Sequence, residues 1–397
     1  LECPQEVIEK LHDIAKNTDE VLKSLQIIPE YESKVAHYSR PSTAFSLFGD
    51  EKNNKNPSNF RLSTIRGVND PTEGLVLNGY WNQQGIPETI HTNDTATFIS
   101  CFTFNHDNLN QFRLYGKEDG REATGVSLVF NKEFFSDQSD TLEYIVDTSS
   151  DPSNKFGKNK SDEAEKPESN NKKLPIDKTT LYRCIYLDPE TGYWNLAQRD
   201  KSTFYRDGKR KAKEEWEKYQ KSVQEKGGNV ERYLFIPFYR KYKEKIEEEW
   251  EGYQKLMQEK KENFKKYLFN DDISILHLLE KIFPKYSSYT EEEKQQILET
   301  VRFILLPLQY LVKHIAFQEE QECRIMYTTH LHDEKIHHDW EKQWMYVEYN
   351  ACVRDHIDKI YLSPGAAKYQ DHFRIRLDQG SGKSKVRISQ NPFRNKE

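Results

Sequence analysis

The sequence has few cysteines, and no pattern pairs them. Five cysteines are scattered over 397 residues, and none belongs to a Cys-x-x-Cys pair. An odd, scattered set is typical of a reducing compartment and argues against a disulfide framework or a zinc knuckle. We therefore expect a cytoplasmic protein, native to that cell or delivered into it, with no metal cofactor.

Long apolar runs and a strong excess of one charge are also absent. No run approaches the ~18 apolar residues of a membrane-spanning helix, so we expect no membrane partner. The net charge of −6 comes from 59 basic and 65 acidic residues that are interleaved, which gives no case for general nucleic-acid affinity. A glycine-rich phosphate loop is missing, so side chains and strand edges must hold any nucleotide.

The chain is instead rich in aromatic and charged residues, at 13% and 31% of its length. The pattern predicts one α+β domain with a mixed or antiparallel β core, interrupted by a helical insertion. Its expected parts are an N-terminal helix over 1–28, the first part of the core over 29–135, a disordered or loop insertion over 136–180, a returning strand over 181–204, a duplicated charged helical insertion over 205–270, and the second part of the core over 271–397.

The pattern after the insertion predicts helices and then strands. Thr290 and Glu293 form a capping box that starts a helix running to about Val312. The expected strands that follow are Trp344–Tyr349, Ile357–Leu362, Phe373–Leu377 and Val386–Ser389.

An internal repeat occupies 205–270. Tyr205–Phe235 matches Tyr239–Phe269 at a constant offset, with Trp216 and Trp250 at equivalent positions. The spacing suits a tetratricopeptide repeat, but two copies without small packing residues favour a helical hairpin inserted as a strut or lid. Its Trp/Tyr stripe is a candidate surface for a protein partner.

The acidic stretch before an apolar segment is the main candidate site. Glu320, Glu322 and Arg324 alternate, so on an extended strand all three side chains share one face. Cys323 then points to the opposite face and is expected to be a packing residue. The structural alternative is a solvated sheet edge on which Arg324 neutralises two acids.

Seven short motifs, read in order, resemble a bacterial family of unknown function, which in turn resembles the ADP-ribosyltransferase clan. In this sequence they are His37-Tyr38-Ser39, Asn69-Asp70-Pro71-Thr72-Glu73, Ser100–Thr103, Phe112–Tyr115, Gly125–Asn131, Lys313 with Glu320–Arg324, and Ser389–Arg394. The chain departs from that pattern at Phe112, where the family usually has Trp, and at Thr103. The resemblance implies an ADP-ribosyltransferase-like fold and NAD as a substrate.

The resemblance also implies roles for single residues. Glu322 is the expected catalytic carboxylate, Glu320 positions the acceptor or is structural, and Arg324 orients Glu322. A carboxylate near the ribose 2′-hydroxyl stabilises the oxocarbenium-like transition state that forms when nicotinamide leaves.

Arg324 is also expected to bind NAD, and the other expected NAD-binding residues lie earlier in the chain. The resemblance implies that His37 binds ribose or adenosine hydroxyls and counts among the catalytic residues, and that Ser100 contributes from a strand. Tyr115 is the candidate for stacking on nicotinamide, and Tyr38 is its rival.

Three hypotheses follow for the function. The first is an NAD-cleaving mono-ADP-ribosyltransferase, used as a toxin, effector or defence enzyme, with an unidentified acceptor expected to be protein. The second is a non-catalytic module that binds a partner through the paired helices. A nucleic-acid-acting defence protein ranks last, because the basic stretch Lys209–Lys213 runs into acids.

Two further groups of polar residues have open interpretations. Asp70 and Glu73 either face the substrate or cap the following helix. His330, His332, His337 and His338 form an exposed polar face more readily than a metal site.

Overall fold

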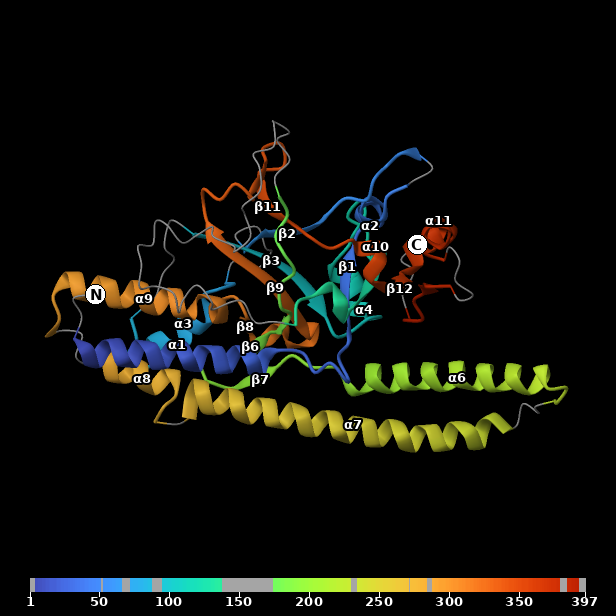
Figure 1. Cartoon of the computed structure of the whole chain (residues 1–397), viewed down its shortest axis with the longest axis horizontal. Helices are drawn as coiled ribbons and strands as arrows, with labels where there is room; N and C mark the ends of the chain where they lie inside the picture. Colours follow the sequence, from blue (N-terminus) through green and yellow to red (C-terminus); the bar gives the residue numbers. More distant parts are fainter. Residues whose placement is uncertain are drawn as a thin grey trace, which may run out of the picture.

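The computed structural model describes residues 4–50, 53–65, 72–87, 95–137, 174–229, 234–270, 272–283, 288–378 and 384–392. Its helices and strands form an α+β fold around a mostly antiparallel sheet, with two long helices running beneath it (Figure 1). Most of the stretch expected to be disordered, 136–180, lies outside the described residues.

The described strands form a 10-stranded main sheet. Its strands are β1 (Lys34–Ser39), β2 (Phe60–Thr64), β3 (Thr95–Thr103), β4 (Val126–Asn131), β5 (Tyr182–Arg183), β9 (Glu322–His330), β10 (His337–Asp339), β11 (Trp344–Tyr349), β12 (Ile357–Leu362) and β13 (Val386–Ile388). They follow the order β10-β11-β2-β3-β1-β4-β12-β13, and β9 lies between β3 and β5. A smaller, 3-stranded sheet joins β7 (Trp194–Leu196), β6 (Ile185–Leu187) and β8 (Val312–His314).

The main sheet branches at β3. β9 pairs with one edge of β3 along its whole length, ending with Glu322 opposite Thr103. A strand has only two edges, so β2 and β1 share the other one. β2 pairs near Ile99, and β1 meets β3 only where Ala36 lies opposite Thr103. The start of β9 therefore lies beside the point where the sheet divides.

Each face of the sheet is covered by a separate apolar core. Phe98 and Phe102 pack with α2 (Pro41–Phe48), α10 (Val353–His356) and α11 (Gln370–Leu377). Their neighbours Ile99 and Met326 belong to the other core, which contains α1 (Gln5–Leu25), α3 (Val76–Gln83), α8 (Ile275–Ile282) and α9 (Glu291–Gln309). This alternation follows from the two-residue period of a strand. The shorter helices are α4 (Leu109–Leu114), η3 (Lys132–Phe134), η7 (Lys266–Asn270), η9 (Ile315–Glu320) and η10 (Pro364–Tyr369).

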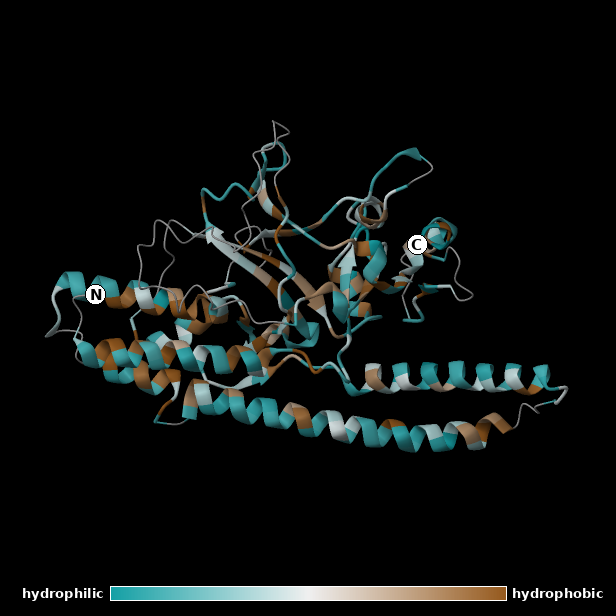
Figure 2. Cartoon of the chain, viewed as in Figure 1, coloured by the Kyte–Doolittle hydropathy of each residue, from teal (hydrophilic) through white to brown (hydrophobic). Residues whose placement is uncertain are grey.

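Each copy of the repeat forms one helix, and the two helices make a single antiparallel hairpin. These are α6 (Lys201–Glu225) and α7 (Phe235–Lys265), and Figure 2 shows that most of their residues are hydrophilic. Trp216 packs against Phe235 and Phe238 across the hairpin, and Trp250 packs against Phe204. Both tryptophans therefore hold the helices together, where a partner-binding stripe was expected.

The base of the hairpin is also fixed to the core by a buried ion pair. Arg183 donates hydrogen bonds of 3.1 and 2.6 Å to the two carboxylate oxygens of Glu32, and both side chains are fully buried. The hydroxyl of Tyr253, on α7, donates to the same carboxylate at 2.6 Å. Burial lowers the pKa of Arg183, but Glu32 outweighs this effect and raises it.

Two predictions of secondary structure were wrong. Phe373 and Leu377 lie on helix α11 and both are buried, whereas Ile375 between them is 58% exposed. The buried residues of this segment therefore follow the four-residue spacing of a helix and not the two-residue period of the predicted strand. Glu320 ends the 3-10 helix η9, so only Glu322 and Arg324 alternate on a strand.

The sequence signal for α9 was more accurate. The capping box of Thr290 and Glu293 is confirmed, and α9 continues through Pro307 to Gln309. Val312, expected at the end of this helix, lies in strand β8. Among the described residues, no helix combines the length and apolar character needed to cross a bilayer.

Replacing Glu32 by Gln tests the buried ion pair. The variant keeps the shape of the side chain but leaves the Arg183 charge without its partner, so we expect the free energy of unfolding to fall by about 3–5 kcal/mol. Urea denaturation measures this loss. The exposed Glu30→Gln change removes the same charge nearby and should cost less than about 0.5 kcal/mol. Equal stabilities for the two variants would contradict the assigned role of Glu32.

Candidate functional site

Six polar side chains from distant parts of the chain meet beside the division of the sheet. This Lys313 cluster consists of Glu73, Tyr115, Lys313, Glu320, Glu322 and Arg324. Lys313 Nζ donates to Glu320 at 2.6 Å and to Glu322 at 2.5 Å. The residues come from three of the motifs on which the family resemblance rests, so the fold brings those motifs to one place.

The start of β9 positions the central carboxylate. Glu322 opens the strand, and its backbone N–H donates to the hydroxyl of Tyr186 at 2.8 Å. Arg324 lies two residues later on the same face, and its Nε donates to Glu322 Oε1 at 2.6 Å. Cys101 pairs with Arg324 across the sheet and so shares this face. Cys323 points to the opposite core, where it is fully buried, as its place in the sequence predicted.

A local turn brings Glu320 into the same cluster. Gln321 has the left-handed backbone conformation, with φ of 46°, which turns the chain between η9 and β9. The Glu320 carbonyl accepts hydrogen bonds from Thr103 Oγ1 at 2.7 Å and from Gln111 Nε2 at 3.2 Å. Its carboxylate accepts a hydrogen bond of 2.7 Å from the hydroxyl of Tyr115. Glu320 therefore joins the site from outside the strand.

Glu73 binds Arg324 and does not cap the helix that follows it. The Arg324 guanidinium donates to both Glu73 oxygens, at 2.7 and 3.1 Å, and also to the Tyr310 carbonyl at 2.8 Å. The N-terminus of α3 has no side-chain cap. The expectation of a cap was thus wrong for Glu73, and Asp70 lies outside the described residues.

The charges of the cluster control one another. Burial raises the pKa of Glu322, but Arg324 and Lys313 outweigh this effect and hold it well below its usual value. Burial lowers the pKa of Lys313, yet Glu322 and Glu320 raise it far above the ordinary range. Burial and the neighbouring Glu320 raise the pKa of Tyr115. At neutral pH Glu322 is a carboxylate, Lys313 is a cation, and Tyr115 keeps its proton.

An open apolar hollow lies next to these charges. Its volume is about 340 Å³, and its lining residues are Thr72, Leu75, Val76, Gly79, Pro189, His314 and Phe317. Lys313 Nζ lies 5.2 Å from the centroid of the Phe317 ring, which links the hollow to the cluster. Phe317 is 36% exposed, so part of its side chain is open to solvent beside the hollow.

The structure brings together four of the predicted site residues and separates three others. Tyr115, Glu320, Glu322 and Arg324 share the Lys313 cluster. His37, Tyr38 and Ser100 lie outside it. The fold therefore does not bring the expected NAD-binding residues His37, Tyr38 and Ser100 into one cluster with the expected catalytic carboxylate Glu322.

His37 lies on the other face of the sheet from Glu322. Ala36 pairs with Thr103 and shares its face, so the next residue of β1 points the opposite way. The His37 ring packs against Phe60 and Phe102, and its Nδ1 lies 2.8 Å from the Cys101 carbonyl, in the gap where β1 leaves β3. Burial lowers the pKa of His37, so the ring is neutral at neutral pH.

Tyr38 and Ser100 have structural contacts of their own. The Tyr38 hydroxyl donates to the Asn105 carbonyl and accepts from the Asn108 backbone N–H, both at 2.9 Å. Ser100 is buried and pairs with Ile325, which places it on the opposite face from Arg324. Neither side chain contacts the carboxylates.

No role was predicted for Lys313 from the sequence, although this residue belongs to one of the seven motifs. The signal was a lysine inside the apolar run Tyr310–Phe317, because a buried lysine requires a carboxylate partner. Among the residues that the structure describes, no His, Cys, Asp and Glu side chains form a group of three or more able to hold a metal ion. Comparison with protein-family models, curated proteins and solved structures gave no match.

The pH dependence of stability tests the ionised state of Glu322. Its pKa is lower in the folded chain than its usual value of 4.5, so the unfolded chain binds a proton first as the pH falls. The stability that Glu322 contributes is therefore present above about pH 4.5 and is lost below it. We expect a shallower fall in the free energy of unfolding for Glu322→Gln than for wild type from pH 5 to 3.

A series of denaturant titrations at fixed ionic strength measures this slope. The exposed Glu319→Gln variant is the matched control and should keep the wild-type slope. Identical slopes for Glu322→Gln and wild type would show that Glu322 is not held ionised.

Proposed function

We propose that this chain is an NAD-cleaving ADP-ribosyltransferase whose reaction centre is the Lys313 cluster. The observation that carries the proposal is the convergence of Glu320 and Glu322 on Lys313, beside an apolar hollow. The branched, mostly antiparallel sheet is compatible with the ADP-ribosyltransferase-like fold that the motifs imply.

In this proposal Glu322 stabilises the developing positive charge on the ribose. Arg324 and Lys313 each donate to one of its carboxylate oxygens, and the Cys101 thiol is a third hydrogen-bond partner of this carboxylate. Its orientation is fixed before substrate arrives, because both cations are themselves buried and bonded. Preorganised charge of this kind favours the transition state over the ground state.

The remaining groups have supporting roles. Glu320 is held by Lys313 and by the Tyr115 hydroxyl, and it positions the acceptor. The hollow beside Phe317 receives the departing nicotinamide ring against its apolar lining. Tyr115 uses its hydroxyl to bind Glu320, so we transfer the stacking role expected of Tyr115 to Phe317. His37, Tyr38 and Ser100 have no part in this version of the mechanism.

A non-catalytic interaction module is the second candidate. The observation in its favour is the exposure of Tyr219, Leu234 and Ile236 near the far end of the hairpin, at 50%, 43% and 63%. A deletion of 205–270 is unsuitable as its test, because Tyr253 and Phe264 of α7 are completely buried in the core. Polar substitutions at Leu234 and Ile236 leave those contacts intact.

Nicotinamide release tests the enzymatic proposal. We expect the purified chain to release nicotinamide from NAD and the Glu322→Gln variant to do so about 100-fold more slowly, because it loses the charge that stabilises the oxocarbenium-like sugar. Glu319→Gln removes an exposed carboxylate from the same segment and should retain the wild-type rate.

Circular dichroism and a thermal melt of each variant separate loss of chemistry from loss of fold. A folded Glu322→Gln variant with the wild-type rate would refute the assignment of Glu322. Absence of release by the wild-type chain, with water and with added protein acceptors, would count against NAD cleavage and favour the interaction module.

A further inference from the structure

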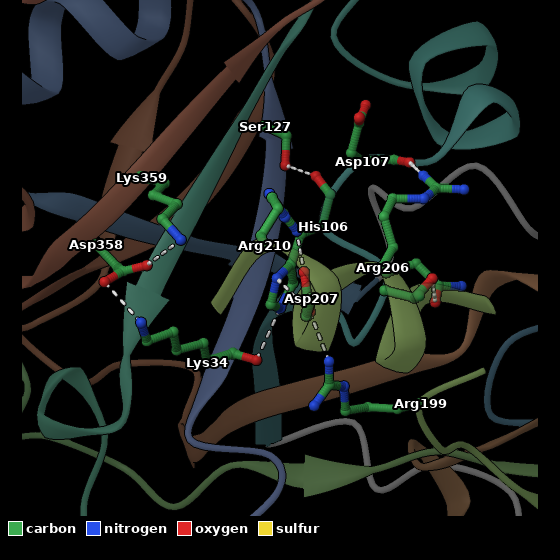
Figure 3. Close-up of polar contacts among 12 residues, drawn as sticks. Lys34, His106, Asp107, Ser127, Arg199, Arg206, Asp207, Arg210, Asp358 and Lys359 are labelled. Carbon is green, nitrogen blue, oxygen red and sulfur yellow. Dashed lines mark hydrogen bonds and ion pairs between the residues drawn. The ribbon is translucent and has the colours of Figure 1, made fainter. Parts of the chain in front are cut away.

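A second group of charged side chains lies between α6 and the strands β1 and β12, and it shares no residue with the Lys313 cluster (Figure 3). Its cations are Lys34, Lys359, Arg199, Arg206, Arg210 and Arg387, and the carboxylates near them are Asp107, Asp200, Asp207, Asp358 and Glu214. We call this group the α6 basic cluster. The cations outnumber the carboxylates.

The strand side of the cluster presents several cations on one face of the sheet. Lys359 pairs with Val129 of β4, and Val129 pairs with Ala36 of β1, two residues from Lys34. Arg387 of β13 lies opposite Tyr361, which is two residues after Lys359. Paired residues and alternate residues share a face, so Lys34, Lys359 and Arg387 project to the same side.

The helix side adds two guanidinium groups. Arg206 and Arg210 are four residues apart on α6 and therefore lie on the same side of the helix. The guanidinium carbon of Arg210 lies 5.3 Å from the centroid of the ring of Tyr361, the buried residue that pairs with Arg387. Helix and strands thus direct Arg206, Arg210 and Arg387 toward one region.

Most carboxylates in this region are already occupied. Asp358 lies 2.7 Å from Lys34 Nζ and 3.9 Å from Lys359 Nζ. Asp207 is shared by Arg199, at 2.5 Å, and Arg210. The Asp107 carboxylate accepts hydrogen bonds from Ser389 and Asn391, and Glu214 has an interaction partner of its own.

Two arginines consequently lack a carboxylate partner. Arg206 reaches only the Asp107 carbonyl, at 3.4 Å, and Arg387 donates to the carbonyls of Ser384 and Val386. Within the described ranges, no carboxylate lies within ion-pair distance of either guanidinium. Burial lowers the pKa of Arg210, the Asp107 carboxylate raises it, and the charges of Arg206 and Arg387 lower it. The three guanidinium groups are therefore close enough to repel one another, and Asp107 offsets part of that repulsion.

We propose that Arg206, Arg210 and Arg387 form a binding site for the phosphate groups of a small anionic ligand. A guanidinium group presents N–H donors in a planar fork that matches two phosphate oxygens, and an anion among three such groups relieves their repulsion. Lys359, which is half-buried beside Arg210, adds a further positive charge. The site is separate from the reaction centre proposed above, and its existence does not depend on NAD cleavage.

Isothermal titration calorimetry of the full chain with inorganic pyrophosphate tests the site. We expect saturable binding at constant ionic strength, and Arg387→Gln and Arg206→Gln should each weaken it about 10-fold, because each removes charge-assisted hydrogen bonds. These two residues make no ion pair within the described chain, so their loss should leave the fold intact, which a thermal melt checks. Arg210→Gln is less suitable, because it also breaks the contact with Asp207.

The matched controls are Lys213→Gln and Lys221→Gln, which remove the same charge from exposed positions on α6. Both should bind pyrophosphate as the wild type does. Equal weakening in the controls, or absence of saturable binding by the wild type, would overturn the proposal. Parallel titrations with inorganic phosphate, ADP and NAD identify the source of the phosphate: tighter binding of a nucleotide than of pyrophosphate indicates a nucleotide, and the reverse order indicates a free anion.

Discussion

The buried ammonium group of Lys313 is the interaction on which the candidate site depends. Burying one charge in a protein interior costs several kcal/mol unless a partner of opposite charge offsets the cost. Lys313 meets this requirement with Glu320 and Glu322, which come from two different elements that follow it in the chain. Strand β8, helix η9 and strand β9 are therefore tied together by one cation. Lys313 in turn holds the two carboxylates in place, because moving its ammonium group away would leave both of them without this buried cation.

A second buried ion pair supports the same strand from its other side. Arg183 of β5 pairs with Cys323, whereas Glu322 and Arg324 on either side of Cys323 point to the Lys313 cluster. Glu32 neutralises Arg183, and Tyr253 of the hairpin donates to Glu32. The first residues of β9 thus carry buried charge networks on both faces. Such networks add little net stability compared with apolar packing, but each rejects any arrangement that leaves one charge unpaired.

The sequence predicted the local features of this site more accurately than it predicted which residues belong to the site. Alternation alone placed Glu322 and Arg324 on one face and Cys323 in the opposite core, because the two-residue period of a strand does not depend on its neighbours. It could not place His37 relative to Glu322, since that relation depends on the register between β1 and β3. A shift of one residue reverses the face of every side chain in a strand. The partner of Arg324 was hidden for a similar reason, because Glu73 reaches it from a loop.

The helical hairpin is connected to the Lys313 cluster through polar contacts and not only through packing. Thr203 at the start of α6 contacts the side chain of Asn105 at 3.5 Å, and the Asn105 backbone N–H donates to Thr103 Oγ1 at 3.1 Å. The Thr103 hydroxyl in turn donates to the Glu320 carbonyl at 2.7 Å. These contacts run from the first turn of α6 to Glu320, whose carboxylate Lys313 binds. A contiguous chain of polar contacts therefore joins the start of α6 to the backbone of Glu320.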